Sequence, residues 1–165
     1  MTDFDAEEIR EVYGRYVATR ERIQAGELPW SALGEFFTED AVFIDPAWGR
    51  VEGREALIAW FDDSMEGLQD WTFPEAWTVV EGDRVVSFWW NRLPGSRDDG
   101  TPHQAPGVSI LRYGGDGRFF YEHDLLNMTE VGEVIGASGW QPTGDFNMPP
   151  RHPSRDISPP AGRPT

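Results

Sequence analysis

Three carboxylates of this sequence stand where apolar segments end. Asp45 precedes Pro46, directly after the apolar stretch 41–44. Near the end of another apolar segment, Glu122 and Asp124 are two residues apart, so in an extended strand both point to one face. Apolar surroundings raise the pKa of a carboxylate, and a base with a pKa closer to neutral abstracts a carbon-bound proton more effectively. The pattern predicts acid–base chemistry by Asp45, Asp124 or both.

Each carboxylate also has a structural interpretation. An Asp before Pro, as in Asp45-Pro46, is typical of a turn residue that caps nearby backbone N–H groups. Asp124 would face solvent if the strand had the opposite register, because a slip of one residue reverses every side chain. The residues alone leave both alternatives open.

His103 is the third candidate for proton transfer. It is an even number of residues from Ala105 and Ser109, so in an extended strand the three side chains point to the same face. Its imidazole would then reach the mouth of a pocket on that face. Histidine carries protons near neutral pH. The alternative is a solvated histidine at the rim, because a polar loop precedes it. We expect no metal site and no cofactor, since the sequence has no Cys and its three His are scattered.

Bulk composition narrows the class of protein. The 165 residues fit one domain, and eight Trp with ten Phe suit both a large core and a cavity for a ring-shaped ligand. The net charge of −15 argues against nucleic acid or an anionic membrane surface as a partner. The acidic start lacks a signal-like apolar region, and no apolar run reaches the ~20 residues that span a bilayer. We therefore expect a cytoplasmic protein.

The elements that must position these groups follow from the periodicity. Apolar residues at helical spacing predict a long helix between Asp5 and Gly26, a short helix over 30–37 and a third helix from Gly53 to about Met65. The second half changes to strand-like segments, separated by glycine-rich turns. These segments are 71–80, 84–92, 104–113 and 118–126. Three helices and an antiparallel meander predict an α+β domain in which a curved sheet wraps the long helix.

The sequence divides into residues 1–138 as this domain and residues 139–165 as a Pro-rich tail. Repeated prolines exclude regular structure there. One interpretation is a disordered tail. The other is a strap across the pocket mouth or a partner subunit, anchored by Trp140, Phe146 and Met148.

Two local stretches resemble a known group. The stretch 36–46, followed by 53–57, is similar to SnoaL-like polyketide cyclases and ketosteroid isomerases of the nuclear transport factor 2-like superfamily, and 117–124 resembles the final strand of that superfamily. The resemblance covers roughly residues 5–135. It implies a cone-shaped fold around a hydrophobic pocket. One fold hosts many chemistries, so its implication for activity is weaker.

Matched residue by residue, the resemblance assigns roles. In ketosteroid isomerases the general base is the Asp of an Asp-Pro pair, which matches Asp45, and a helical Tyr donates to the developing enolate, which matches Tyr16. The third group, a protonated Asp, falls on Ser109, which departs from the pattern. SnoaL-like cyclases and limonene epoxide hydrolases place an inward Asp on the last strand, which matches Asp124. The histidine that precedes the cyclase Asp corresponds to Glu122.

The resemblance therefore implies an acid–base enzyme acting on a small hydrophobic cyclic or polycyclic substrate by isomerisation, cyclisation, dehydration or epoxide opening. The alternative is a non-catalytic small-molecule-binding or dimerisation module, because no subfamily's residue set is complete. A homodimer is expected from the resemblance and from exposed aromatic side chains on the open sheet face. The predicted catalytic residues are Asp45, Asp124, Tyr16 and His103. The predicted pocket residues are Trp60, Trp77, Trp89, Asn91, Ser109, Glu122 and Leu126.

Overall fold

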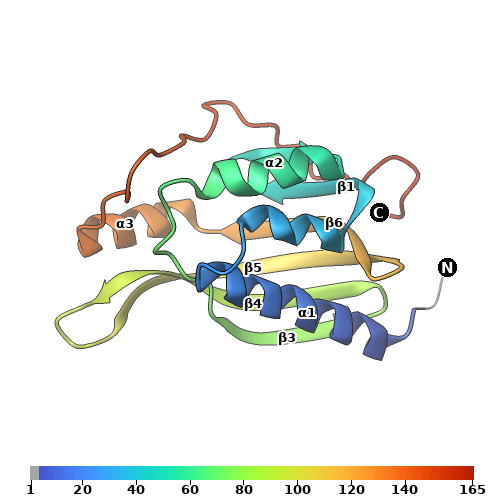
Figure 1. Cartoon of the computed structure of the whole chain (residues 1–165), viewed down its shortest axis with the longest axis horizontal. Coiled ribbons are helices and arrows are strands. Elements are labelled where there is room, and N and C mark those ends of the chain that lie inside the picture. The colour runs from blue at the N-terminus through green and yellow to red at the C-terminus, as the bar shows by residue number, and fades with distance from the viewer. Residues whose placement is uncertain (1–3) are drawn as a thin grey trace.

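The computed structural model describes residues 4–165 as one curved sheet with helices across its inner face (Figure 1). The six strands are β1 (Phe37–Asp45), β2 (Gly49–Glu52), β3 (Glu75–Glu81), β4 (Arg84–Ser96), β5 (Pro102–Gly115) and β6 (Arg118–Leu126). Their order across the sheet is β2-β1-β6-β5-β4-β3. Strands β3 to β6 form the predicted antiparallel meander, whereas β1 pairs with β6 in parallel. The predicted α+β cone is confirmed.

The helices are α1 (Ala6–Gln24), the 3₁₀ helix η1 (Trp30–Phe36), α2 (Arg54–Met65) and α3 (Met128–Ser138). The Asp5 side chain accepts from the N–H of Glu7 and caps α1, an interaction typically worth about 1 kcal/mol. The apolar face of α1 packs against aromatic residues of the sheet, where Tyr16 and Phe119 meet edge to face. The main core therefore lies between α1, η1, α2 and one end of the sheet.

Two elements were not predicted. Strand β2 is short and pairs only with β1, and α3 follows the last strand. Asn127 caps the start of α3, because its side chain accepts from the N–H groups of Thr129 and Glu130. Its C-cap is Gly139 in the left-handed conformation. Helix α3 packs on β4 and β5 with Val131 and Val134 buried, and so closes the end of the sheet that the main core leaves open.

Residues 139–165 have no helix or strand but follow a defined path from α3 past α2 towards β1 (Figure 1). The first part is held by a hydrogen bond from Trp140 Nε1 to Asp70, 3.1 Å long. The last part is held by the paired contacts of Arg163 with Asp40, each 2.9 Å long. Between these anchors the tail is held by hydrogen bonds from Asn147 to the Asp63 carbonyl and from Arg155 to the Pro46 carbonyl.

Candidate active site

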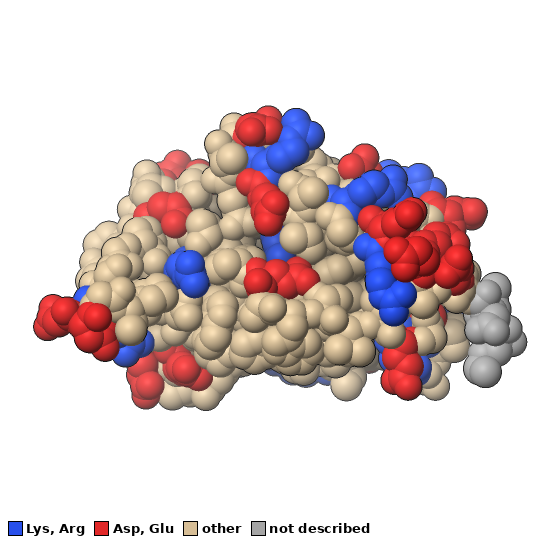
Figure 2. Space-filling view, turned by 90° about the horizontal axis from the view of Figure 1, so that it is seen from below, with Lys and Arg blue, Asp and Glu red and all other residues tan. Residues whose placement is uncertain are grey.

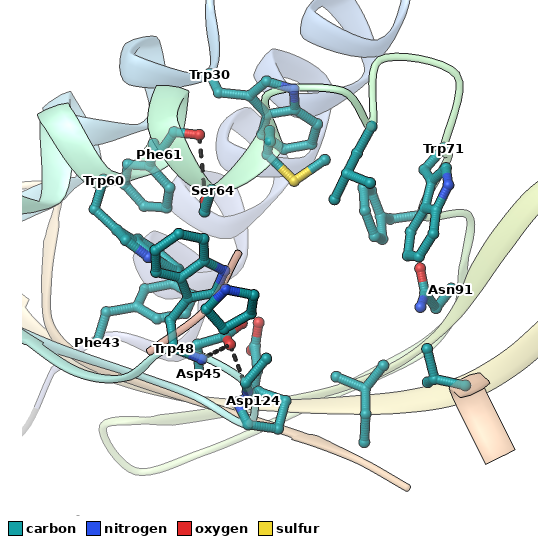
Figure 3. Close-up of a pocket in the computed structure, with 18 of the residues that line it drawn as sticks. Trp30, Phe43, Asp45, Trp48, Trp60, Phe61, Ser64, Trp71, Asn91 and Asp124 are labelled. Carbon is teal, nitrogen blue, oxygen red and sulfur yellow. Dashed lines mark hydrogen bonds between the residues drawn. The ribbon is translucent and has the colours of Figure 1, made fainter. Parts of the chain in front are cut away.

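A cavity of about 290 Å³ lies inside the cone, between the inner face of the sheet and the helices (Figure 3). Its wall is mostly apolar and rich in aromatic side chains, with a smaller number of polar ones. The labelled aromatic residues of Figure 3 that line it are Trp30, Phe43, Trp48, Trp60, Phe61 and Trp71. The tail contributes Trp140, Phe146, Asn147 and Pro149 to the same wall. Hydrophobic pockets with few polar groups are typical of sites for small molecules.

Asp124 lies at the end of a chain of hydrogen bonds that crosses three strands. Trp89 Nε1 on β4 donates to Ser109 Oγ over 2.9 Å, and Ser109 Oγ on β5 donates to Asp124 Oδ1 on β6 over 2.5 Å. Ser109 and Asp124 are directly opposite in the β5–β6 register. Gly107 makes this chain possible, because a Cβ there would lie 2.7 Å from the Trp89 ring. The inward register of Asp124 is therefore the one adopted.

Glu122 lies two residues before Asp124 on the same inner face. It is 3% exposed, and Tyr16 Oη donates to its Oε2 over 3.1 Å. Tyr16 comes from the middle of α1 and is itself buried, so its hydroxyl is engaged by a carboxyl group of the chain. Tyr16 thus contacts the candidate acid–base pair rather than offering a free donor to the cavity.

Burial perturbs both carboxyl groups. It is the main cause that raises the pKa of Glu122 well above its usual value, and the neighbouring charge of Asp124 adds to the effect. Burial also raises the pKa of Asp124 to about 7, with a further contribution from the charge of Asp45 and a lowering one from the Ser109 hydrogen bond. Both carboxyl groups therefore keep a proton to a higher pH than exposed carboxyl groups do, and the pKa of Asp124 lies near neutral pH. Asp124 is partly accessible from the cavity although protein surrounds it on all sides, so it is placed to meet a ligand.

Asp45 lines the cavity beside this pair, but it also caps backbone N–H groups of a turn, which is the structural role expected of an Asp before Pro. Its Oδ1 accepts the N–H groups of Ala47 and Trp48, each over 2.7 Å, in the turn between β1 and β2. Burial raises the pKa of Asp45 despite these two bonds. Asp45 therefore holds Trp48 in the cavity wall and places a third carboxyl group near Asp124 (Figure 3).

Six of the seven predicted pocket residues line the cavity, namely Trp60, Trp89, Asn91, Ser109, Glu122 and Leu126. Asn91 is 4% exposed, and its Oδ1 has no hydrogen-bond partner in the described chain. It lies across the cavity from Asp45 and Asp124, next to Trp71 (Figure 3). The cavity thus has two polar regions with aromatic walls between them.

Two predicted residues do not line the cavity. His103 is buried on the inner side of β5, but it is six residues from Ser109, which in a strand is roughly 20 Å. Trp77 is 51% exposed and stacks on Phe88 at the outer face, with ring planes 11° apart. The register of β3 shifts between Glu75 and Trp77, and this bulge turns Trp77 outward.

The sequence interpretation missed Arg20, which is one turn after Tyr16 on α1 and lines the cavity while only 8% exposed. The spacing of four residues on one helix face was the available signal. It also missed the cavity residues Trp30, Trp48 and Trp71, which come from loops and from η1, where no periodicity marks the inward side. In residues 4–165, no group of three His, Cys, Asp or Glu is arranged to hold a metal ion. No described helix has the length and apolar character to cross a bilayer.

Comparisons with known proteins agree with this architecture. Among solved structures, a SnoaL-like protein of Shewanella putrefaciens superposes with a TM-score of 0.60 at 16% identity, over 79% of this chain and 86% of that one. SalBIII, described as an epoxide hydrolase/cyclase-like enzyme in pyran ring formation in salinomycin, superposes with a TM-score of 0.58 at 19% identity. The match covers 76% of this chain and 95% of SalBIII. A protein of Catenulispora acidiphila with a ketosteroid isomerase-like fold superposes with a TM-score of 0.55 at 22% identity. The match covers 77% of this chain and 97% of that one.

These identities are low and show the fold alone. A sequence search of curated proteins found no match. The family model of the SnoaL-like domain matches residues 7–122, which is most of α1 to β6. The matched range contains Tyr16, Asp45, Ser109 and Glu122, and it ends two residues before Asp124. The chain belongs to the SnoaL-like domain family.

Proposed function

We propose that this protein is an acid–base enzyme that moves a proton on a small hydrophobic cyclic molecule. One observation carries the proposal: Glu122 and Asp124 lie on the same face of β6 at an aromatic cavity, with the pKa of Asp124 raised to about 7 by burial. A general base is most effective when its pKa is near the working pH. Two interacting carboxyl groups of this kind provide one acid and one base.

The proposed chemistry assigns a role to each group. Asp124, as carboxylate, takes the proton from a carbon or a hydroxyl group of the bound molecule, and protonated Glu122 is the acid that donates a proton to another atom of the same molecule. Ser109 holds Asp124 and Tyr16 holds Glu122, so neither carboxyl group reorients during transfer. Isomerisation, cyclisation, dehydration and epoxide opening all require this equipment. The cavity of about 290 Å³ favours a molecule of one or two rings, since pockets for drug-sized ligands have volumes of roughly 300–1,000 Å³.

Hydrogen–deuterium exchange tests the proposal without knowledge of the natural substrate. One- and two-ring ketones such as 1-indanone and 2-tetralone, incubated with the protein in D₂O, are expected to exchange their α-protons faster than in buffer, as followed by ¹H NMR. Asp124→Asn should abolish the acceleration, and Asp98→Asn, in an exposed loop, should retain it. An acceleration unchanged by Asp124→Asn would contradict the assignment.

The second candidate is a small-molecule-binding module without catalysis. The engagement of Asp45 by two backbone N–H groups favours it, because this removes one of the expected bases. Binding of the same ketones, seen as quenching of Trp fluorescence, with no exchange in any of them, is the result that this candidate predicts.

We further propose that the outer face of the sheet pairs with a second copy. Trp77 and Val79 are 51% and 54% exposed there, and Trp77, Phe88 and Trp90 form a contiguous aromatic stripe. Seen from below, the charged residues gather towards the two ends and the upper part of the molecule, and a broad area without charge lies along its lower part (Figure 2). An apolar interface on the outer face would let two acidic chains associate without bringing their negative charges into contact.

A further inference from the structure

Arg20 is the buried charge that the mechanism above does not use. It lies on α1 four residues after Tyr16, so both side chains leave the same face of the helix. Only 8% of Arg20 is exposed, and it lines the cavity. Among the described residues that line the cavity, it is the one that carries a positive charge.

The hydrogen-bonding capacity of Arg20 is only partly used inside the protein. Its Nη2 is 3.5 Å from Glu75 Oε2, longer than the roughly 2.7–2.9 Å of a charge-assisted hydrogen bond. Its Nε is buried with no hydrogen-bond partner in residues 4–165. Glu75 also receives hydrogen bonds from Tyr13 and Thr78 and does not depend on Arg20. A buried guanidinium with free donors is costly unless a ligand or the reaction uses it.

We propose that Arg20 donates hydrogen bonds to a carbonyl oxygen of the substrate and stabilises the negative charge that this oxygen gains. The inference rests on the proposed function and narrows its substrate class to enolisable carbonyl compounds. Asp124 takes the proton from the carbon next to the carbonyl. The electron pair of that C–H bond forms a carbon–carbon double bond, and the carbonyl π pair moves to the oxygen beside Arg20. Return of the proton to a carbon restores the carbonyl.

Arg20 fits this role better than the other donors of the cavity. The hydroxyl of Tyr16 already donates a hydrogen bond to Glu122, and the hydroxyl of Ser109 already donates one to Asp124. The amide of Asn91 and the indole N–H groups of Trp60 and Trp71, both unpaired within residues 4–165, carry no charge. The developing enolate lies near Asp124, which becomes neutral as it takes the proton, and near Asp45, whose negative charge opposes the enolate. A nearby cation offsets this repulsion in a site shielded from water. Removal of one such donor typically costs about 10²–10³ in rate.

The test uses 2-naphthol, a planar two-ring phenol whose ionised form resembles an enolate. In wild-type protein at pH 6, absorbance is expected to show that bound naphthol ionises more readily than free naphthol. In Arg20→Gln, the bound naphthol should stay neutral and the Kd of the ionised form should rise at least tenfold. Arg20→Lys keeps the charge and should retain part of the effect. Arg22→Gln, an exposed site on the same helix, is the matched control.

The double variant Arg20→Gln/Glu75→Gln removes both charges and keeps the test valid if the single variant does not fold. Equal ionisation of naphthol in wild-type protein and in the folded Arg20 variants would overturn the role of Arg20 while leaving the proposed function in place. A failure of naphthol and of the ketones to bind wild-type protein at all would overturn the proposed function, and this inference with it.

Discussion

Replacing Asp124 with Asn should make the protein more stable at neutral pH and inactive. Burial raises the pKa of Asp124 from 3.8 to about 7, so the folded state holds a proton that the unfolded state releases. The contribution of Asp124 to stability is therefore fully present below pH 3.8 and is lost as the pH rises towards 7. A difference of about three pKa units corresponds to at most about 4 kcal/mol, at 1.36 kcal/mol per unit.

Asn cannot ionise, and its Oδ1 still accepts the Ser109 hydroxyl. The free energy of unfolding, measured with urea at intervals from pH 4 to pH 8, should be equal for both proteins at pH 4. At pH 8 the free energy of unfolding should be up to about 4 kcal/mol higher for Asp124→Asn than for wild-type protein. The control Asp98→Asn, at an exposed position, should show no such trend. A difference that does not change with pH, or that favours wild-type protein at pH 8, would refute the reasoning.

Three other substitutions probe the parts that support the site. Gly107→Ala places a Cβ 2.7 Å from the Trp89 ring, so a loss of about 1–3 kcal/mol in urea unfolding and a shifted Trp89 indole N–H resonance are expected; an unshifted resonance would contradict the packing. Trp140→Phe removes the hydrogen bond to Asp70, and naphthol should dissociate faster in stopped-flow fluorescence; an unchanged rate would show that the tail does not cover the site. Trp77→Arg should convert the proposed dimer to monomer in sedimentation velocity at unchanged circular dichroism; a dimer that persists would place the interface elsewhere.

The fold could be read from the sequence to a large extent, because its signals are local. The apolar face of α1 and the glycine turns at 81–83 and 114–117 place the long helix and the hairpins. Helix α3 was missed although Asn127, with Glu130 three residues later and Gly139 at its end, carries ordinary start and stop signals. Strand β2 has four residues and no apolar alternation, and it forms only because β1 is beside it.

The site was predictable only where strand alternation held. Strand alternation places Glu122 and Asp124 on one face of β6, and the resemblance makes that face the inward one, as it is in the structure. The parity of β3 fails at the bulge before Trp77, which no residue type there signals. The engagement of Tyr16 by Glu122, residues 106 apart in the sequence, is a long-range contact that local patterns cannot give. For that reason we propose Arg20, rather than Tyr16, as the donor to the substrate oxygen.

The central claim is that Glu122 and Asp124 exchange a proton near neutral pH, and a titration of the carboxyl groups by ¹³C NMR tests it directly. With Asp124→Asn and Glu122→Gln used for assignment, we expect a carboxyl resonance of the wild-type pair to titrate near pH 7, and this transition to disappear in Asp124→Asn. If every Asp and Glu resonance of the wild-type protein titrates below pH 5, the pair carries no proton at neutral pH and the claim is wrong.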